Sequence, residues 1–179
     1  TDGSFSADKF ERRTFVIEAW DGLDALGVTR IMGKDVLKLA SDERAVCPMP
    51  SQGRLNLDMT AIATSFTVTP SGVGADYDTS GFVRIGSEVM SYTRSGDVFT
   101  IVRGQRNTIA ATHKQLDTVQ LCKDFVGQTS QNIVYELLTT FAGVDASYID
   151  KAAWDAEQVG YLPRLYNAII TTPTGVSKL

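Results

Sequence analysis

The sequence contains few residues that could carry out catalysis. Its single histidine, His113, lies in a loop-like stretch rich in threonine and alanine. Nucleophilic catalysis needs a base held against a serine or cysteine, and a third group that orients the base. Asp117 is close to His113 in the sequence, but no serine occurs in the Gly-x-Ser-x-Gly pattern that exposes a nucleophile on a sharp turn. We therefore expect His113 to be a hydrogen-bonding loop residue.

Three pairs of carboxylates are close in the sequence and raise the question of a cell-wall hydrolase. They are Asp21 with Asp24, Asp76 with Asp78, and Asp155 with Glu157. A glycosidase needs its two carboxylates roughly 5–10 Å apart across a sugar-sized cleft, and proximity in sequence does not show that geometry. Each pair falls in a predicted turn or on the solvated side of a predicted helix. We expect all three pairs to be solvated surface and the chain not to be an enzyme.

Neither a metal site nor a cofactor site is predicted. Cys47 and Cys122 are far apart, and with one histidine they cannot complete a standard zinc site. The segment Asp76-Tyr77-Asp78 lacks the further spaced oxygens and the terminal glutamate of a calcium-binding loop. Two cysteines in 179 residues predict free, partly buried thiols in a protein assembled in a reducing cytoplasm.

Composition and charge are those of a globular protein with one or two structural units. The chain is 43% hydrophobic and 21% charged, and its net charge of -4 gives no broad positive field for nucleic acid. The string from Arg103 to Thr108 has no interleaved aromatic residues, so it predicts a structured turn. No apolar run reaches the roughly 18 residues of a membrane span. Because the chain lacks a starting methionine and both ends look cut, we expect an internal fragment of a longer polypeptide.

The pattern of residues predicts an α+β fold with three parts. Residues 1–50 are expected to hold strands at 13–19 and 28–32, the second ending at Gly33, and a short helix at 35–40 capped by Asp35. Val36, Leu37 and Leu39 of that helix are expected to face inward. Two prolines and a glycine in the stretch 47–53 mark a boundary.

The second and third parts cover residues 51–124 and 125–179. Strands are expected at 66–69, 82–85, 89–92, 98–102 and 118–122, and the short glycine-bearing links at Gly86 and Gly96 predict an antiparallel meander or a small partial barrel. Beyond it, helices are expected from Thr129 or Ser130 to about Ala142, ended by Gly143, and over residues 147–158, followed by a strand at 164–171. The middle part is either built into the body or inserted into it.

The central segment resembles a recurring element of bacteriophage tail proteins, most of all the hub or tail-tip proteins of long non-contractile tails and related prophages. The resemblance lies in residues 81–93, 99–105, 110–113 and 117–120, and residues 33–40 and 148–154 look similar to flanking parts of such proteins. The residues of the motif are Gly81, Gly86, Gly96, Arg103, Gly104, Asn107, His113 and Asp117. Similar proteins often have glycine in place of Asn107, which predicts a positive φ at this position. They commonly have a hydrophobic residue in place of Arg106.

The resemblance implies a structural subunit of the virion that forms a homotrimeric hub at the baseplate end of the tail tube and takes part in host cell attachment. Its implied partners are the distal tail protein, the tape measure protein and tip or fibre proteins. An alternative is a cell-surface glycan-binding module. Exposed aromatic residues on one face of the sheet would favour it, and the candidates are Tyr77, Phe82, Tyr92 and Phe99.

Overall fold

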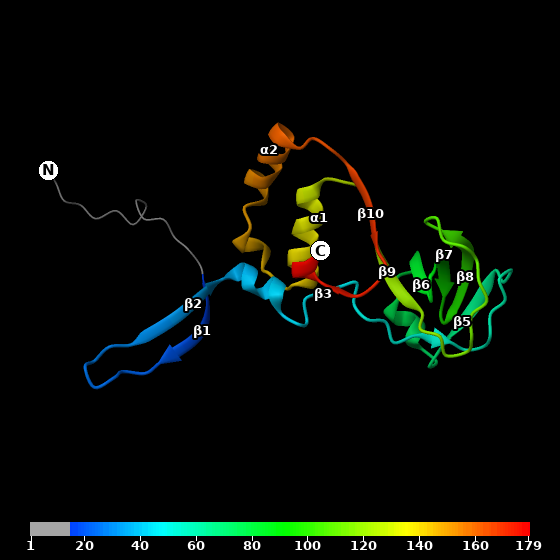
Figure 1. The fold of residues 1–179 in the computed structure, drawn as a ribbon, viewed down its shortest axis with the longest axis horizontal. Helices are drawn as coiled ribbons and strands as arrows, with labels where there is room; N and C mark the ends of the chain where they lie inside the picture. Colours follow the sequence, from blue (N-terminus) through cyan, green and yellow to red (C-terminus); the bar gives the residue numbers. More distant parts are fainter. Residues whose placement is uncertain (1–14) are drawn as a thin grey trace.

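The largest part of the fold is a curled, antiparallel seven-stranded sheet, a half-barrel, built mostly from the middle of the chain (Figure 1). The structure is a computed structural model that describes residues 15–179. The strands lie in the order β10-β9-β6-β7-β8-β5-β4. Their bounds are β4 Arg54–Leu55, β5 Ser65–Thr69, β6 Ser80–Ile85, β7 Glu88–Ser95, β8 Val98–Gln105, β9 Gln120–Gln128 and β10 Tyr166–Ile170. With the helices described below, this sheet confirms the predicted α+β class.

The predicted meander is present as β6, β7 and β8. The turns between these strands place Gly86 and Gly96 at φ +59°, a left-handed conformation that glycine adopts without steric cost. β9 then returns along the free edge of β6, with Cys122 opposite Phe82, and continues to Gln128, where β10 pairs with it. The sheet therefore extends from the middle part of the chain into the last part.

An aromatic cluster fills the concave side of the sheet. Phe99 is fully buried at its centre, with the ring of Phe66 stacked 5.1 Å away, the edge of Tyr77 at 5.2 Å and Tyr92 at 4.9 Å. The Tyr77 hydroxyl donates a 2.6 Å hydrogen bond to the carbonyl of Val119, so its polar end is satisfied inside the core. Aromatic residues at strand spacing thus form the core of this sheet.

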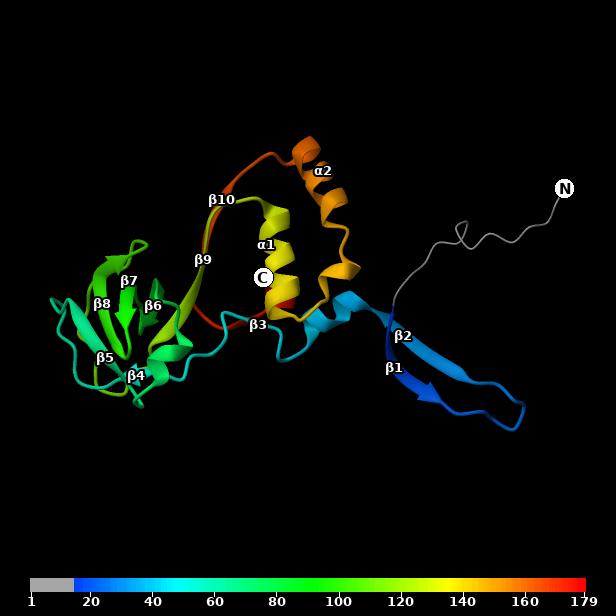
Figure 2. The same cartoon turned by 180° about the vertical axis from the view of Figure 1, so that it is seen from behind.

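Helix α1 (Ser130–Glu136) lies beside the long strand β9, and α2 (Lys151–Tyr161) packs on the other side of α1, as both views of the ribbon show (Figures 1 and 2). A wider π-type turn (η4, Leu137–Phe141) continues α1, and Gly143 follows at φ +68°, as expected for a helix end. The second helix begins at Lys151 and not at residue 147, because the Asp150 carboxylate accepts a hydrogen bond from the Ala153 N–H and caps it there. Residues 146–148 form a separate 3-10 turn, η5 (Ala146–Tyr148).

A second, smaller core joins the first helix to β3 and to the C-terminal residues. β3 (Val46–Cys47) pairs with β11 (Thr174–Gly175), which is followed by the 3-10 turn η6 (Val176–Lys178). Cys47, Phe125 and Leu137 are buried there together. Both cysteines are free and buried, and burial raises the pKa of each thiol to about 12. They are therefore protonated, poorly reactive core residues.

The first described residues form a hairpin, the arm, that projects from the rest of the molecule (Figures 1 and 2). It consists of β1 (Phe15–Asp21) and β2 (Arg30–Asp35); the first two residues of the predicted strand 13–19 lie outside the described residues. The expectation that β2 ends at Gly33 is wrong. β2 runs through Gly33 to Asp35, and the Phe15 side chain packs over the glycine, where a Cβ would be 3.0 Å from that of Phe15.

The short helix after the arm is a 3-10 helix, η2 (Val36–Ser41), capped as expected by the Asp35 carboxylate. Val36 and Leu39 are half-buried, but Leu37 is 50% exposed, so its expected inward position is wrong. A 3-10 helix has three residues per turn, which puts residues 36 and 39 on one side and residue 37 on another.

Candidate functional site

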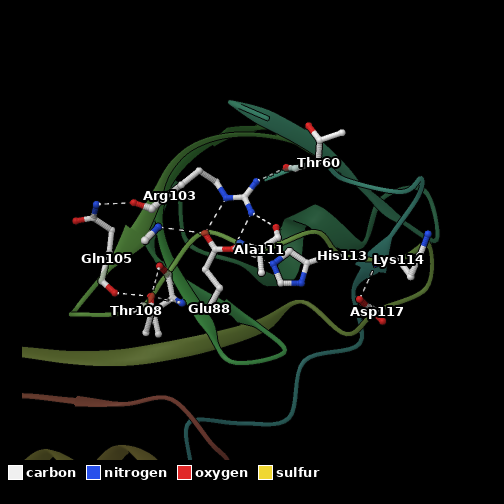
Figure 3. Close-up of polar contacts among 11 residues, drawn as sticks. Thr60, Glu88, Arg103, Gln105, Thr108, Ala111, His113, Lys114 and Asp117 are labelled. Atoms are coloured by element: carbon white, nitrogen blue, oxygen red, sulfur yellow. Dashed lines mark hydrogen bonds and ion pairs between the residues drawn. The ribbon is translucent and has the colours of Figure 1, made fainter. Parts of the chain in front are cut away.

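Three of the motif residues, Arg103, Gly104 and His113, surround a buried carboxylate, that of Glu88. Its side chain is 0% exposed at the start of β7, directly after the Gly86 turn. The Arg103 guanidinium donates from Nε to Oε1 and from Nη2 to Oε2, both at 2.7 Å (Figure 3). His113 Nε2 lies 2.8 Å from Oε2, and the backbone N–H groups of Gly104 and Ala111 donate over 3.1 and 3.0 Å. We call Glu88, Arg103 and His113 the Glu88 network.

Three separate stretches of chain place these groups. Arg103 is near the end of β8, and its remaining donors reach the carbonyls of Thr60 at 2.7 Å and Ala111 at 2.5 Å. His113 lies in the long loop after β8, where its backbone pairs with Met59 through bonds of 2.8 and 2.9 Å. The Glu88 network therefore joins the loop before β5 and the loop before β9 to the centre of the sheet.

The charge of Glu88 is strongly favoured in the folded chain. Burial raises the pKa of its carboxyl, but the hydrogen bonds from Arg103, His113 and two backbone N–H groups outweigh burial and lower the pKa from 4.5 to about 2. Both carboxylate oxygens are occupied by donors. The carboxylate can thus hold the loops in place, but it has no unoccupied oxygen to offer a substrate.

This pKa predicts how stability depends on pH. A carboxylate with a depressed pKa stabilises the fold above its unfolded value, near pH 4.5, and loses that contribution as the pH falls towards about 2. The difference in free energy of unfolding between the wild-type chain and Glu88→Gln should therefore be constant near neutrality and shrink from pH 4.5 to pH 2. Urea unfolding followed by far-ultraviolet circular dichroism measures it, and a difference that stays constant down to pH 2 would contradict the assignment.

The structure brings some of the predicted motif residues together and separates others. Arg103, Gly104 and His113 meet at Glu88. The rest serve local geometry: Gly86 and Gly96 in the turns, Gly81 in β6 against the ring of Tyr92, Asn107 in the next turn, and Asp117 accepting from the Lys114 N–H at 2.8 Å. Asp117 is not hydrogen-bonded to His113, and the histidine is a buried hydrogen-bonding loop residue, as expected.

Glu88 itself was missed by sequence reasoning. Its signal is a lone acidic residue directly after the Gly86 turn, at the start of a strand whose next two residues are apolar. A carboxylate seldom lies fully buried unless it is paired, so this position calls for a cation elsewhere in the chain. Arg103, near the end of the neighbouring strand β8, is that cation. Only the pairing of β7 with β8 shows that the two side chains meet.

Asn107 and Arg106, the two residues expected to differ from the similar tail proteins, lie in one turn. Asn107 has the expected positive φ of +61°, and Arg106 also has a positive φ of +53°. The Arg106 guanidinium pairs with the Asp124 carboxylate of β9 at 2.6 Å and lies 4.7 Å above the ring of Phe82. An arginine at this position therefore attaches the turn to the sheet through charge and cation–π contact.

The other candidate sites have structural explanations. Tyr77, Tyr92 and Phe99 are buried and Phe82 lies beneath Arg106, so these four do not form an exposed platform for a sugar. Asp24 accepts hydrogen bonds from its own turn, and Asp155 pairs with Lys151. Within residues 15–179 no group of three or more metal-ligating side chains converges. Over the same residues, no helix is long and apolar enough to cross a membrane.

A second feature of functional interest is the uncovered arm. Four large apolar residues of β1 and β2 lie on one face of the arm. This follows from the alternation of side chains along each strand and from the register, in which Ile17 is opposite Gly33 and Trp20 is opposite Ile31. This apolar arm face consists of Phe15, Ile17, Trp20 and Ile31, all more than half exposed, with Trp20 at 72%. The opposite face carries the ion pair of Lys34 with Glu18. The exposed Met32 also lies on this opposite face, so the arm has apolar side chains on both faces, most of them on the apolar arm face, which no part of residues 15–179 covers.

Comparisons of the chain with protein-family models, with curated proteins and with solved structures find no match.

Proposed function

We propose that this chain is a structural component of a phage tail tip and works through its interfaces with other tail proteins, not through catalysis. In this role it belongs to a homotrimeric hub in the virion, assembled in the host cytoplasm. The hub joins the tail tube and distal tail protein to tip or fibre proteins and closes the tube around the tape measure protein.

The observation that carries the proposal is the apolar arm face. A two-stranded ribbon is at best marginally stable in water, and a contiguous apolar surface of this kind marks an interaction site. An arm of this form suits a protein that is held in place by neighbours in an assembly. The resemblance of residues 81–120 to tail proteins agrees with it, as does a half-barrel whose buried carboxylate fixes loops.

Deletion of the coding segment from the phage or prophage tests the proposal. We expect particles with filled capsids but with tails that are absent or lack tips, because tail assembly needs its hub. Expression of the segment in trans, within its natural polypeptide, should restore complete tails, as seen by electron microscopy. Normal, infectious tails after deletion would refute the proposal.

A further inference from the structure

Strand β5 leaves part of its outer edge unpaired. On one side it pairs with β8, where the Val68 N–H donates to the Asp97 carbonyl at 3.0 Å. Backbone groups alternate in direction along a strand, so those of Ser65 and Thr67 face the other edge. β4 covers only the end of that edge, and the last bond runs from the Asn56 N–H to the Thr67 carbonyl at 2.9 Å. Within residues 15–179 the N–H groups of Ser65 and Thr67 and the carbonyl of Ser65 have no hydrogen-bond partner.

A hollow lies along this free edge. It has a volume of about 320 Å³, at the lower end of the range of about 300–1,000 Å³ for ligand pockets. β5 forms one wall, and the loop that follows β4 forms the other. We call it the β5 edge groove; its lining includes Leu57, Met59, Thr60, Ser65, Phe66 and Thr67.

The groove is held open by bonds on the far side of the loop. Met59 exchanges backbone hydrogen bonds of 2.8 and 2.9 Å with His113, and the Thr60 carbonyl accepts from Arg103 at 2.7 Å (Figure 3). These bonds attach the loop to the segment before β9 and to the Glu88 network, so the loop does not close onto β5. The open groove is therefore part of the folded chain.

The polar groups of the free edge match the backbone of an extended peptide. An N–H, a carbonyl and a second N–H face outward in the spacing of a β-ladder. Residues 64–67, Thr-Ser-Phe-Thr, include none of the prolines or charges that usually protect an exposed edge. The lining suits alternating side chains, because Met59 and Phe66 are buried on the core side, whereas Ser65 and Thr67 are exposed on the opposite face of β5.

Two other classes of ligand fit the groove less well. A sugar ring is best held against an exposed aromatic ring, and Phe66, the aromatic residue of the lining, is only 9% exposed. A cation such as Ca²⁺ takes several oxygen ligands. The single carboxylate of the lining, Asp58, already pairs with Lys114 at 2.8 Å. The groove therefore favours a peptide.

We infer that the β5 edge groove binds an extended peptide segment, which adds to β5 as a further strand and pairs with Ser65 and Thr67. Its apolar side chains contact Met59 and Phe66, and its polar side chains lie beside Ser65 and Thr67. Strand addition of this kind takes its affinity from main-chain hydrogen bonds and its specificity from alternate side chains. The inference goes beyond the tail-tip role and does not depend on it, because it requires only the free edge and the open groove.

Amide exchange measured by nuclear magnetic resonance tests the contact in the isotope-labelled 179-residue chain. The probe is the peptide acetyl-Thr-Val-Thr-Val-Thr-Val-Thr-amide, which alternates polar and apolar side chains. At saturating peptide, exchange of the Ser65 and Thr67 N–H groups should slow about tenfold, as one added hydrogen bond allows. The Phe66 N–H faces β8, so its exchange should not change. Because main-chain bonds carry the affinity, no slowing at Ser65 and Thr67 would overturn the inference.

Ser65→Pro and Ser65→Ala form a matched pair of variants. Proline removes the Ser65 N–H and blocks strand addition, and it fits a strand edge whose N–H has no partner. The proline variant should therefore keep the circular dichroism spectrum but lose the slowing at Thr67, whereas the alanine variant should behave as the wild type. If Ser65→Pro does not fold, Thr67→Pro removes the other N–H of the edge, and the exchange is measured at Ser65.

Two further outcomes would contradict the peptide site. Equal slowing in the proline variant and the wild-type chain would show that the main chain of β5 does not make the contact. Slowing by the sugar chitotriose, and not by the peptide, would assign the groove to a sugar. Either result would overturn the inference and leave the proposed function standing.

Discussion

Replacing Glu88 with glutamine should lower the free energy of unfolding by about 3–5 kcal/mol, the usual loss when one partner of a buried ion pair is removed. Arg103 is only 11% exposed, so its charge would remain in the interior without a counter-charge. The glutamine amide group would also point a donor at the N–H groups of Gly104 or Ala111, which now donate to the carboxylate. Urea unfolding at neutral pH measures the loss.

Asp58→Asn is the matched control for this variant. Asp58 also pairs with a cation, Lys114, at 2.8 Å, but their side chains are 60% and 80% exposed. Removing an exposed pair should cost far less than removing a buried one, because water and salt screen it. Equal losses in the two variants would show that burial of the Glu88 network does not matter to the fold.

Phe99→Ala should be comparably damaging, with a loss of about 3–5 kcal/mol. Phe99 is fully buried, and its ring contacts those of Phe66, Tyr77 and Tyr92, so the substitution empties the centre of the aromatic cluster. The surrounding strands are held by backbone hydrogen bonds and can close the cavity only in part. The midpoint of urea unfolding should fall while its slope stays nearly unchanged.

Val98→Ala provides the comparison for Phe99→Ala. Val98 is the preceding residue of β8 and points to the opposite side of the sheet, where it is 49% exposed. Its truncation should cost about 0.5 kcal/mol, as is usual for surface positions. If Phe99→Ala cost no more than this, the aromatic cluster would not be the centre of the core.

The half-barrel could be predicted from the sequence because its signals are local. Glycine at Gly86 and Gly96 and the apolar runs between them specify short links and strands that must pair as neighbours. The order in which β9 and β5 join the meander could not be predicted. Those pairings join segments that are far apart in the sequence. No local pattern of residues predicts which free edge of the meander a distant strand will pair with.

The site was predicted only in part for the same reason. Arg103, Gly104 and His113 were identified through the resemblance, but the carboxylate that unites them, Glu88, was not. Its role depends on burial, which the sequence of a single strand does not reveal. The arm shows a further limit: the sequence predicts its two strands, but only the folded chain shows that Trp20 and Ile31 are uncovered.

Location of the chain in the particle tests the proposed assembly role most directly. Antibodies raised against the 179-residue chain and marked with gold can be applied to purified phage and viewed by electron microscopy. We expect the gold label at the end of the tail that is distal to the capsid. Label confined to capsids, or purified particles that contain none of the chain, would contradict the assignment to the tail tip.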